Sequence, residues 1–309
     1  MPKLLTFIFL VVFCVNSGKS QFQTIPMEEE SWEINGQKFN FTTKEGQKSL
    51  YLERSTAIAK AVNFKNGIIE FDILFPESRK FVGFIWRIQD NANYEEFYLR
   101  PHQSGNPDAN QYTPVFNGNS AWQLYHGEGY GQPFAYNFDE WMHVKIIFKD
   151  ADAEFYINDM ETPLFRAYEL KHSPKAGQIG FRATGPEGGA YFANLQYRET
   201  DDIEFKAAPI EKPAITPETI PSWQISGVFP VTALDGITKL SDKEKGRKKW
   251  QKLEAENTGT INISRLHSRT REVNTVFAKC VINSTQEQVK KLNLGYSDAI
   301  HVFCNDQLL

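Results

Sequence analysis

The sequence predicts an all-β fold, an antiparallel β-sandwich followed by a second, smaller β domain. Short runs of β-branched and aromatic residues recur from residue 31 to 198, with polar turns between them. Helical periodicity is missing over the same span. Aromatic residues make up 14% of the chain, 24 of them Phe, and they favour strands. Regular short strands with polar turns are typical of a sandwich rather than an α/β fold.

Each expected strand is placed by its own pattern. Residues 68–75 (IIEFDILF) alternate, with Phe71 on the apolar face and Glu70 and Asp72 on the other. Residues 81–88 (FVGFIWRI) are apolar on both faces, as in a central strand. The other expected strands are residues 94–100, 141–148, 154–158, 176–182 and 190–198. The large side chains expected in the core are Phe71, Phe84, Trp86, Phe97 and Phe181.

The first twenty residues have the order of an export signal. Lys3 gives a positive start, residues 4–15 are apolar, and Gly18 and Ser20 are the small residues before a cleavage site at Gln21. The apolar run is too short to span a bilayer, and no other stretch could cross one. We therefore expect a secreted protein, periplasmic or extracellular, that does not span the membrane.

The remaining chain divides by composition. Residues 21–199 form the predicted sandwich domain. Residues 200–222 carry a proline at every fourth position from 209 to 221, which is typical of a semi-extended linker. Residues 223–309 resume β-like patterning, apart from a helical or charged stretch at 243–256.

The second domain has four or five β-like runs, including 260–264, whereas a jelly roll usually takes about eight strands. We expect an incomplete domain, its sheet completed by a partner, by the first domain, or not at all. Cys280 and Cys304 could pair in an oxidising compartment, or remain free thiols in neighbouring strands.

Five segments within residues 66–197 carry a resemblance to known proteins. In order they are NGIIEFDILF, FVGFIWRIQDNANYEEFYLRPHQSG, WMHVKIIFKDADAEFYIND, AGQIGFRA and AYFANLQY. This order resembles the concanavalin A-like lectin/glucanase superfamily and, within it, laminin-G-like and 3-keto-disaccharide hydrolase-like domains. The resemblance implies the sandwich fold, but that fold hosts lectins, adhesion modules and glycosidases alike. Residues 223–309, through GYSDAIHVFCNDQLL, are similar to a galactose-binding-like jelly roll.

The strand at 70–75 is similar to the glucanase strand that carries the nucleophile and the acid/base, where a third carboxylate follows. A retaining glycosidase needs two carboxyl groups roughly 5 Å apart. Leu74 and Phe75 stand at the positions for the third acid. Glu70 and Asp72 are therefore interpreted as polar face residues, and no catalytic residue is assigned.

A long connection after the strand at 94–100 offers groups that could hold a sugar. Long loops on rigid scaffolds tend to carry function, and guanidinium, carboxylate, amide and aromatic groups together bind hydroxyls and sugar rings. An ordered loop whose polar groups satisfy its own backbone is the alternative. The candidate ligand-binding residues are Glu96, Tyr98, Arg100, His102, Asp108, Asn117, Trp122, Tyr125 and His126. Glu70, Asp72 and Arg87 are expected to share a sheet face with Glu96, Tyr98 and Arg100, as a polar floor.

No cofactor is predicted. Asp90, Asn91 and Asn93 could contribute to a calcium site, although a turn rich in Asp and Asn explains them without a metal. His102 and His126 lack the tight spacing of zinc ligands. With a net charge of −4, nothing indicates nucleic-acid binding, which needs a basic surface, and no nucleic-acid partner is expected. The sequence favours a binder of carbohydrates or glycoconjugates, with a glycoside-processing hydrolase and a laminin-G-like adhesion module as alternatives.

Overall fold

The structure is a computed structural model that describes residues 21–208, 210–211, 214–246 and 249–309. The predicted signal peptide, 1–20, lies outside the described residues. The all-β prediction is confirmed: one large antiparallel sheet carries the first part of the chain, and shorter strands carry the second.

The large sheet follows the order β11-β10-β9-β4-β13-β3-β12-β5-β6-β7-β8, with β1 added to β13 and β2 added to β3. Its strands are β1 (Gln23–Thr24), β2 (Trp32–Lys44), β3 (Gln47–Ala59), β4 (Gly67–Leu74), β5 (Phe81–Asp90), β6 (Asn93–Leu99), β7 (Asn110–Phe116), β8 (Asn119–Ser120), β9 (Met142–Lys149), β10 (Asp152–Ile157), β11 (Phe165–Ala167), β12 (Gln178–Thr184) and β13 (Ala190–Glu199).

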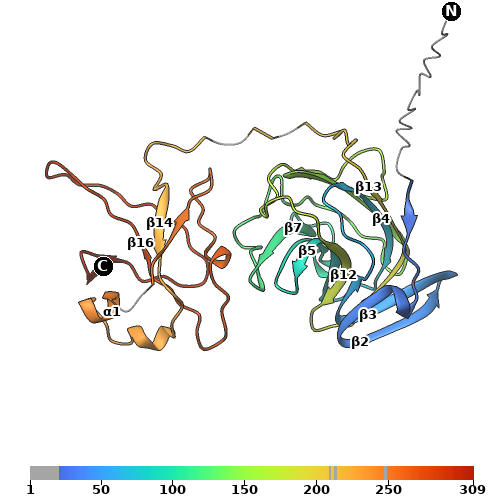
Figure 1. Ribbon diagram of the computed structural model, residues 1–309, viewed down its shortest axis with the longest axis horizontal. Coiled ribbons are helices and arrows are strands. Elements are labelled where there is room, and N and C mark those ends of the chain that lie inside the picture. Colours follow the sequence, from blue (N-terminus) through green and yellow to red (C-terminus); the bar gives the residue numbers. More distant parts are fainter. Residues whose placement is uncertain (1–20, 209, 212–213, 247–248) are drawn as a thin grey trace, which may run out of the picture.

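The sheet curls into two layers at β3. The first half of β3 pairs with β13 and the second half pairs with β12. Arg54 lies between the halves with a left-handed φ of 48°. At this residue the core-facing positions of β3 change from even to odd numbers. The first layer is β11-β10-β9-β4-β13 and the second is β12-β5-β6-β7-β8 (Figure 1).

The predicted core is confirmed. The five predicted side chains, Phe71, Phe84, Trp86, Phe97 and Phe181, are all at most 1% exposed. Phe71 of β4 stacks on Phe84 of β5 with ring centroids 5.1 Å apart, which joins the two layers. Phe97 of β6 lies 4.5 Å from Phe155 of β10 in the same way.

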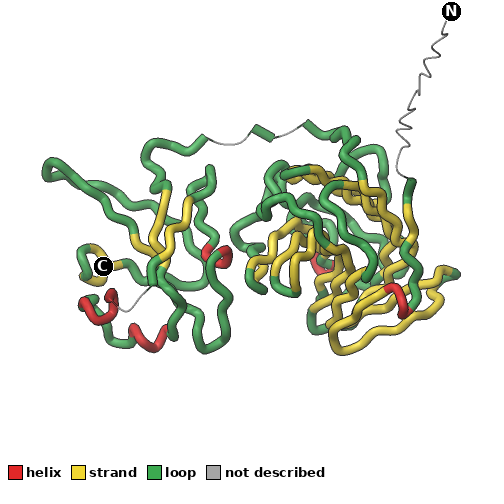
Figure 2. The backbone as a smooth tube through the Cα atoms, in the orientation of Figure 1, coloured by secondary structure: helices red, strands yellow, loops and turns green. Residues whose placement is uncertain are grey.

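The chain after residue 222 is mostly loop, with short strands (Figure 2). Its strands are β14 (Ser222–Ile225), β15 (Gln251–Glu254), β16 (Ala278–Lys279), β17 (Phe303–Cys304) and β18 (Gln307–Leu308), and its short helix is α1 (Asp242–Gly246). They form one sheet in the order β15-β14-β16 and a separate hairpin. Within the described ranges, none of these strands pairs with the sandwich.

Two expectations for this part are resolved by the structure. The strand expected at 260–264 is wrong: a 3-10 turn, η4 (Ile263–Arg265), begins there because the Asn262 side chain accepts a hydrogen bond from the backbone of Ser264. Cys280 and Cys304 are both free thiols. No helix among the described residues is long and apolar enough to cross a membrane.

Candidate ligand-binding groove

A row of polar residues, interrupted by one glycine, crosses the outer face of the second layer. Residues directly opposite each other in paired strands share a face, so the pairing register defines the row. The residues of the row face away from the core because the residues next to them in sequence, Phe181, Phe84 and Phe97, point into it. In order across the sheet, the row is Asn35, Thr56, Arg182, Gly83, Tyr98 and Gln111, which we call the outer-face row.

An ion pair anchors the middle of this face. Arg182 Nη1 donates to Glu96 Oε1 at 2.7 Å. The side chain of Glu96 is only 4% exposed and that of Arg182 is 29% exposed. The neighbouring carboxylate raises the pKa of the Arg182 guanidinium above its usual value, so the guanidinium stays protonated. Part of the Arg182 side chain remains at the surface, where a ligand could reach it.

Arg100 lies at the β7 end of the outer-face row. Its Nη2 donates to Tyr98 Oη at 2.6 Å and to Gln111 Oε1 at 2.9 Å. Its Nη1 donates to Asp108 Oδ2 at 2.7 Å. Its guanidinium carbon lies 5.5 Å from the centre of the Trp122 ring. Burial raises the pKa of Tyr98 to about 12, so its hydroxyl keeps its proton and can donate.

The opposite end of the face is hollowed. A cavity of about 210 Å³ opens between the ends of β2, β3 and β5. Apolar side chains form much of its wall, and amide, hydroxyl and carboxylate groups lie among them, as in many small-molecule sites. The lining residues are Asn35, Thr56, Ile58, Ile85, Ile88, Asp90, Asn91 and Tyr94. We call this cavity together with the outer-face row and Trp122 the groove.

The structure brings five of the nine predicted site residues together at the groove: Glu96, Tyr98, Arg100, Asp108 and Trp122. Glu96, Tyr98 and Arg100 are at most 7% exposed and lie beneath the surface, so Asp108 and Trp122 are the accessible members. Trp122 is the exposed aromatic member, with 46% of its surface accessible. His102 lies beside them, its ring edge-on to Phe81 at 5.5 Å, and burial lowers its pKa.

The other three predicted residues do not line the groove. Tyr125 is 2% exposed, and its hydroxyl donates to Glu256. The Asn117 side chain donates to the carbonyl of Ser264. His126 is exposed on the connecting loop. Both Tyr125 and Asn117 are occupied by a segment far along the chain, and a reading of the local sequence does not reveal that contact.

Five members of the outer-face row were absent from the nine predicted site residues: Asn35, Thr56, Arg182, Gly83 and Gln111. A signal for Arg182 was available, because the predicted burial of Phe181 already turns Arg182 outward. Asn35 and Thr56 depend on the curl at β3, which the alternation pattern alone does not reveal.

The predicted polar floor is wrong for Glu70 and Asp72. They lie on β4, which belongs to the first layer, so they face away from the groove across the whole core. His143 of β9 lies between them, with its Nδ1 2.6 Å from Asp72 Oδ1 and its Nε2 3.4 Å from Glu70 Oε2. Arg87 does not join the floor either, because it donates to the backbone carbonyls of Lys65 and Asp150.

The cluster around His143 is electrostatically paired. Hydrogen bonds to Asp72 and Glu70 raise the pKa of His143 to about 9. The pKa of Glu70 is lowered, first by its hydrogen bond to His143. A glycosidase of this type needs one carboxylic acid whose pKa is raised so that it keeps its proton. Glu70 is shifted in the opposite direction, and Phe75, at the position of a third acid, is buried in the core.

The Asp90 turn is held by hydrogen bonds of its own. Asp90 accepts from the backbone of Ala92 at 2.7 Å and from the Asn93 side chain at 3.0 Å. Short loops rich in Asp and Asn form such side-chain turns without a metal. Within the part of the chain that the structure describes, no group of three His, Cys, Asp or Glu residues is arranged to hold a metal ion.

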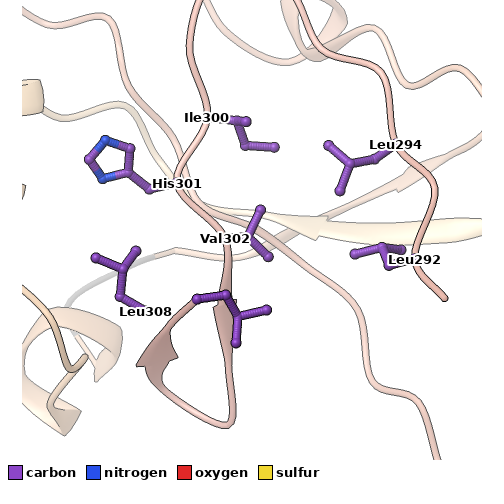
Figure 3. Close-up of a pocket in the computed structure, with 7 residues that line it drawn as sticks. Leu292, Leu294, Ile300, His301, Val302 and Leu308 are labelled. Carbon is purple, nitrogen blue, oxygen red and sulfur yellow. The ribbon is translucent and has the colours of Figure 1, made fainter. Parts of the chain in front are cut away.

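A second hollow, of about 530 Å³, lies among the C-terminal residues (Figure 3). Its lining is aliphatic apart from His301: Leu292, Leu294, Ile300, Val302, Leu308 and Leu309. It lacks the convergent polar side chains that a sugar needs, so the groove on the sandwich is the stronger candidate.

Comparisons with known proteins give structural likenesses only. No family model matches the chain, and neither does any curated protein. The carbohydrate-binding module CBM66 from Bacillus subtilis is 15% identical with a TM-score of 0.41, over 59% of this chain and 98% of that one. A putative glycosyl hydrolase from Parabacteroides distasonis is 14% identical with a TM-score of 0.39, over 58% and 100%. The Bacillus licheniformis β-glucanase is 10% identical with a TM-score of 0.41, over 60% and 99%. Because these identities and TM-scores are low, no binding or catalytic residue of those proteins is assigned to this chain.

Proposed function

We propose that the protein is a glycan-binding protein whose ligand lies in the groove on the second layer. The observation that carries this proposal is the combination of the Arg182–Glu96 pair, the Tyr98–Gln111–Arg100 network and the half-exposed Trp122 ring. Guanidinium and carboxylate groups hydrogen-bond to neighbouring hydroxyls of a sugar, and an indole covers its apolar ring face.

The charge of the groove supports a neutral glycan. Arg182 is paired with Glu96, and Arg100 is paired with Asp108. The two arginines are therefore compensated and offer no net positive charge to a uronic acid or a sulfate ester. The Arg182 side chain, 29% exposed, and the Asp108 carboxylate, 57% exposed, can still donate to hydroxyls and accept from them, which suits an uncharged oligosaccharide or the glycan of a glycoconjugate.

Replacing Trp122 tests the proposal. Trp122→Ala should weaken the affinity for a neutral glycan about tenfold, equivalent to roughly 1.4 kcal/mol, because the ring loses its stacking partner. The melting temperature should change little, since the side chain is half exposed. A glycan screen first identifies the ligand, and isothermal titration then gives the dissociation constants.

Phe39→Ala is the matched control, because Phe39 on β2 is 45% exposed and lies outside the groove lining. It should leave affinity unchanged. Equal affinity of Trp122→Ala and wild type would contradict the proposed site. Release of reducing sugar from the bound glycan would instead favour the hydrolase.

We also propose that the chain is exported and that the mature protein begins at Gln21. The order of charged, apolar and small residues in 1–20 supports this. Cleavage there would make Gln23, which pairs with Tyr197 of β13, the third residue of the mature chain. The intact mass of protein recovered outside the cytoplasm should equal that of residues 21 onward. A mass that includes residues 1–20 would contradict the proposed cleavage.

A further inference from the structure

The C-terminal part of the chain reaches the sandwich beside the groove. In Figure 1 the orange and red C-terminal residues lie next to the side of the sandwich that carries β7. The contact is made on the loop of residues 117–125, which also carries Trp122, and on the neighbouring residues Phe116 and Lys171. We call this loop the Trp122 loop.

Glu256 is the centre of the contact. Its Oε1 accepts from Tyr125 Oη at 2.5 Å, and its Oε2 accepts from Lys171 Nζ at 2.8 Å. Arg265 Nη2 donates to Glu256 Oε1 at 3.1 Å. The side chain of Lys171 is only 3% exposed and that of Glu256 is 14% exposed. A carboxylate with three such partners in a largely buried site is held firmly, because removing it would leave the buried Lys171 ammonium with Glu169, which is more exposed, as its remaining ion-pair partner.

Three further contacts join the same segment to the loop and its flanks. The Asn117 side chain donates to the Ser264 carbonyl at 2.8 Å. Asn262 donates to Tyr125 Oη at 3.4 Å. The Arg265 guanidinium lies 4.5 Å from the centre of the Phe116 ring, at the end of β7.

On the side opposite Glu256, the Trp122 loop is bound by Gln111 of the outer-face row. The Gln111 amide nitrogen donates to the carbonyl of Trp122 at 2.8 Å and also to that of Tyr125. The Gln111 amide oxygen accepts from Tyr98 and Arg100, two members of the proposed binding surface. Tyr125 thus links the two sides: its hydroxyl bonds Glu256, and its backbone carbonyl bonds Gln111 of the groove.

We propose that Glu256 is a positioning residue for the glycan site: it fixes the Trp122 loop from outside the sandwich, so the C-terminal part contributes to affinity without touching the ligand. This inference rests on the proposed function. A loop clamped on both sides presents the indole in one orientation, which reduces the entropy lost on binding.

The test compares Glu256→Gln with Glu254→Gln in the full chain. Glu254 is the matched control because it is two residues away and exposed, and it forms an ion pair with the equally exposed Lys252. The proteins are labelled with 5-fluorotryptophan, and Trp122→Phe identifies the fluorine resonance of Trp122. Glu256→Gln should shift or broaden that resonance and weaken glycan affinity about tenfold. Glu254→Gln should do neither.

An unchanged Trp122 resonance in Glu256→Gln would overturn the inference, and so would unchanged affinity. If that variant fails to fold, Asn117→Gly is used instead. Glycine keeps the left-handed φ of 50° at this position and removes only the side-chain contact to Ser264. If the wild-type protein binds no glycan, the proposed function fails, while the fluorine spectra still decide whether Glu256 positions the loop.

Discussion

Phe71→Ala should lower the free energy of unfolding by about 3–5 kcal/mol, because it empties a large volume where the two layers meet. Phe71 is 1% exposed. Its ring stacks on Phe84 at 5.1 Å and meets Phe181 edge-on at 5.3 Å. These partners belong to different strands of the opposite layer, so the surrounding side chains cannot close the cavity without moving both.

Chemical denaturation with urea measures this effect. Phe39→Ala serves again as the control, because truncating a half-exposed Phe should change stability by only about 0.5 kcal/mol. A loss below about 1 kcal/mol for Phe71→Ala would contradict the assigned position of β4 between the layers.

Arg182→Leu should cost about 3 kcal/mol of stability and abolish measurable glycan binding. The substitution leaves the Glu96 carboxylate, whose side chain is 4% exposed, without its ion-pair partner. Breaking a buried pair by removing one member costs about 3–5 kcal/mol, and the partial exposure of Arg182 places this case at the lower end.

The double variant Arg182→Leu/Glu96→Leu separates stability from binding. Replacing both members removes the unpaired charge, so most of the lost stability should return. Binding should not return, because neither the donor nor the acceptor is present. Restored binding in the double variant would show that the pair is structural only.

Most of the sandwich could be predicted because its strands are marked by local patterns. Alternation with a period of two places Phe71, Phe97 and Phe181 on apolar faces, and all three are buried. The same alternation puts Glu96 and Tyr98 on one outer face, where the structure has them.

Layer assignment could not be predicted in this way. β4 and β5 follow each other in sequence, yet they lie in opposite layers, which separates Glu70 and Asp72 from Glu96. The identity of neighbouring strands depends on the curl at Arg54 and on pairing between strands far apart in the sequence. Neither can be detected in the alternation pattern of a single strand.

The roles of Tyr125 and Asn117 depended on even longer separations. Tyr125 meets Glu256 across 131 positions of the chain, and Asn117 meets Ser264 across 147. A local reading counts both as free polar groups on a loop, whereas the structure uses both to hold the C-terminal segment.

The location of the ligand is tested most directly by nuclear magnetic resonance of the isotope-labelled protein during a titration with the neutral glycan found in the screen. We predict that the largest chemical-shift changes fall on the Trp122 indole NH, the Arg182 guanidinium and the Tyr98 backbone, while His143 on the opposite layer stays unchanged. Changes centred on His143, Glu70 and Asp72, with the groove unaffected, would contradict the proposed site.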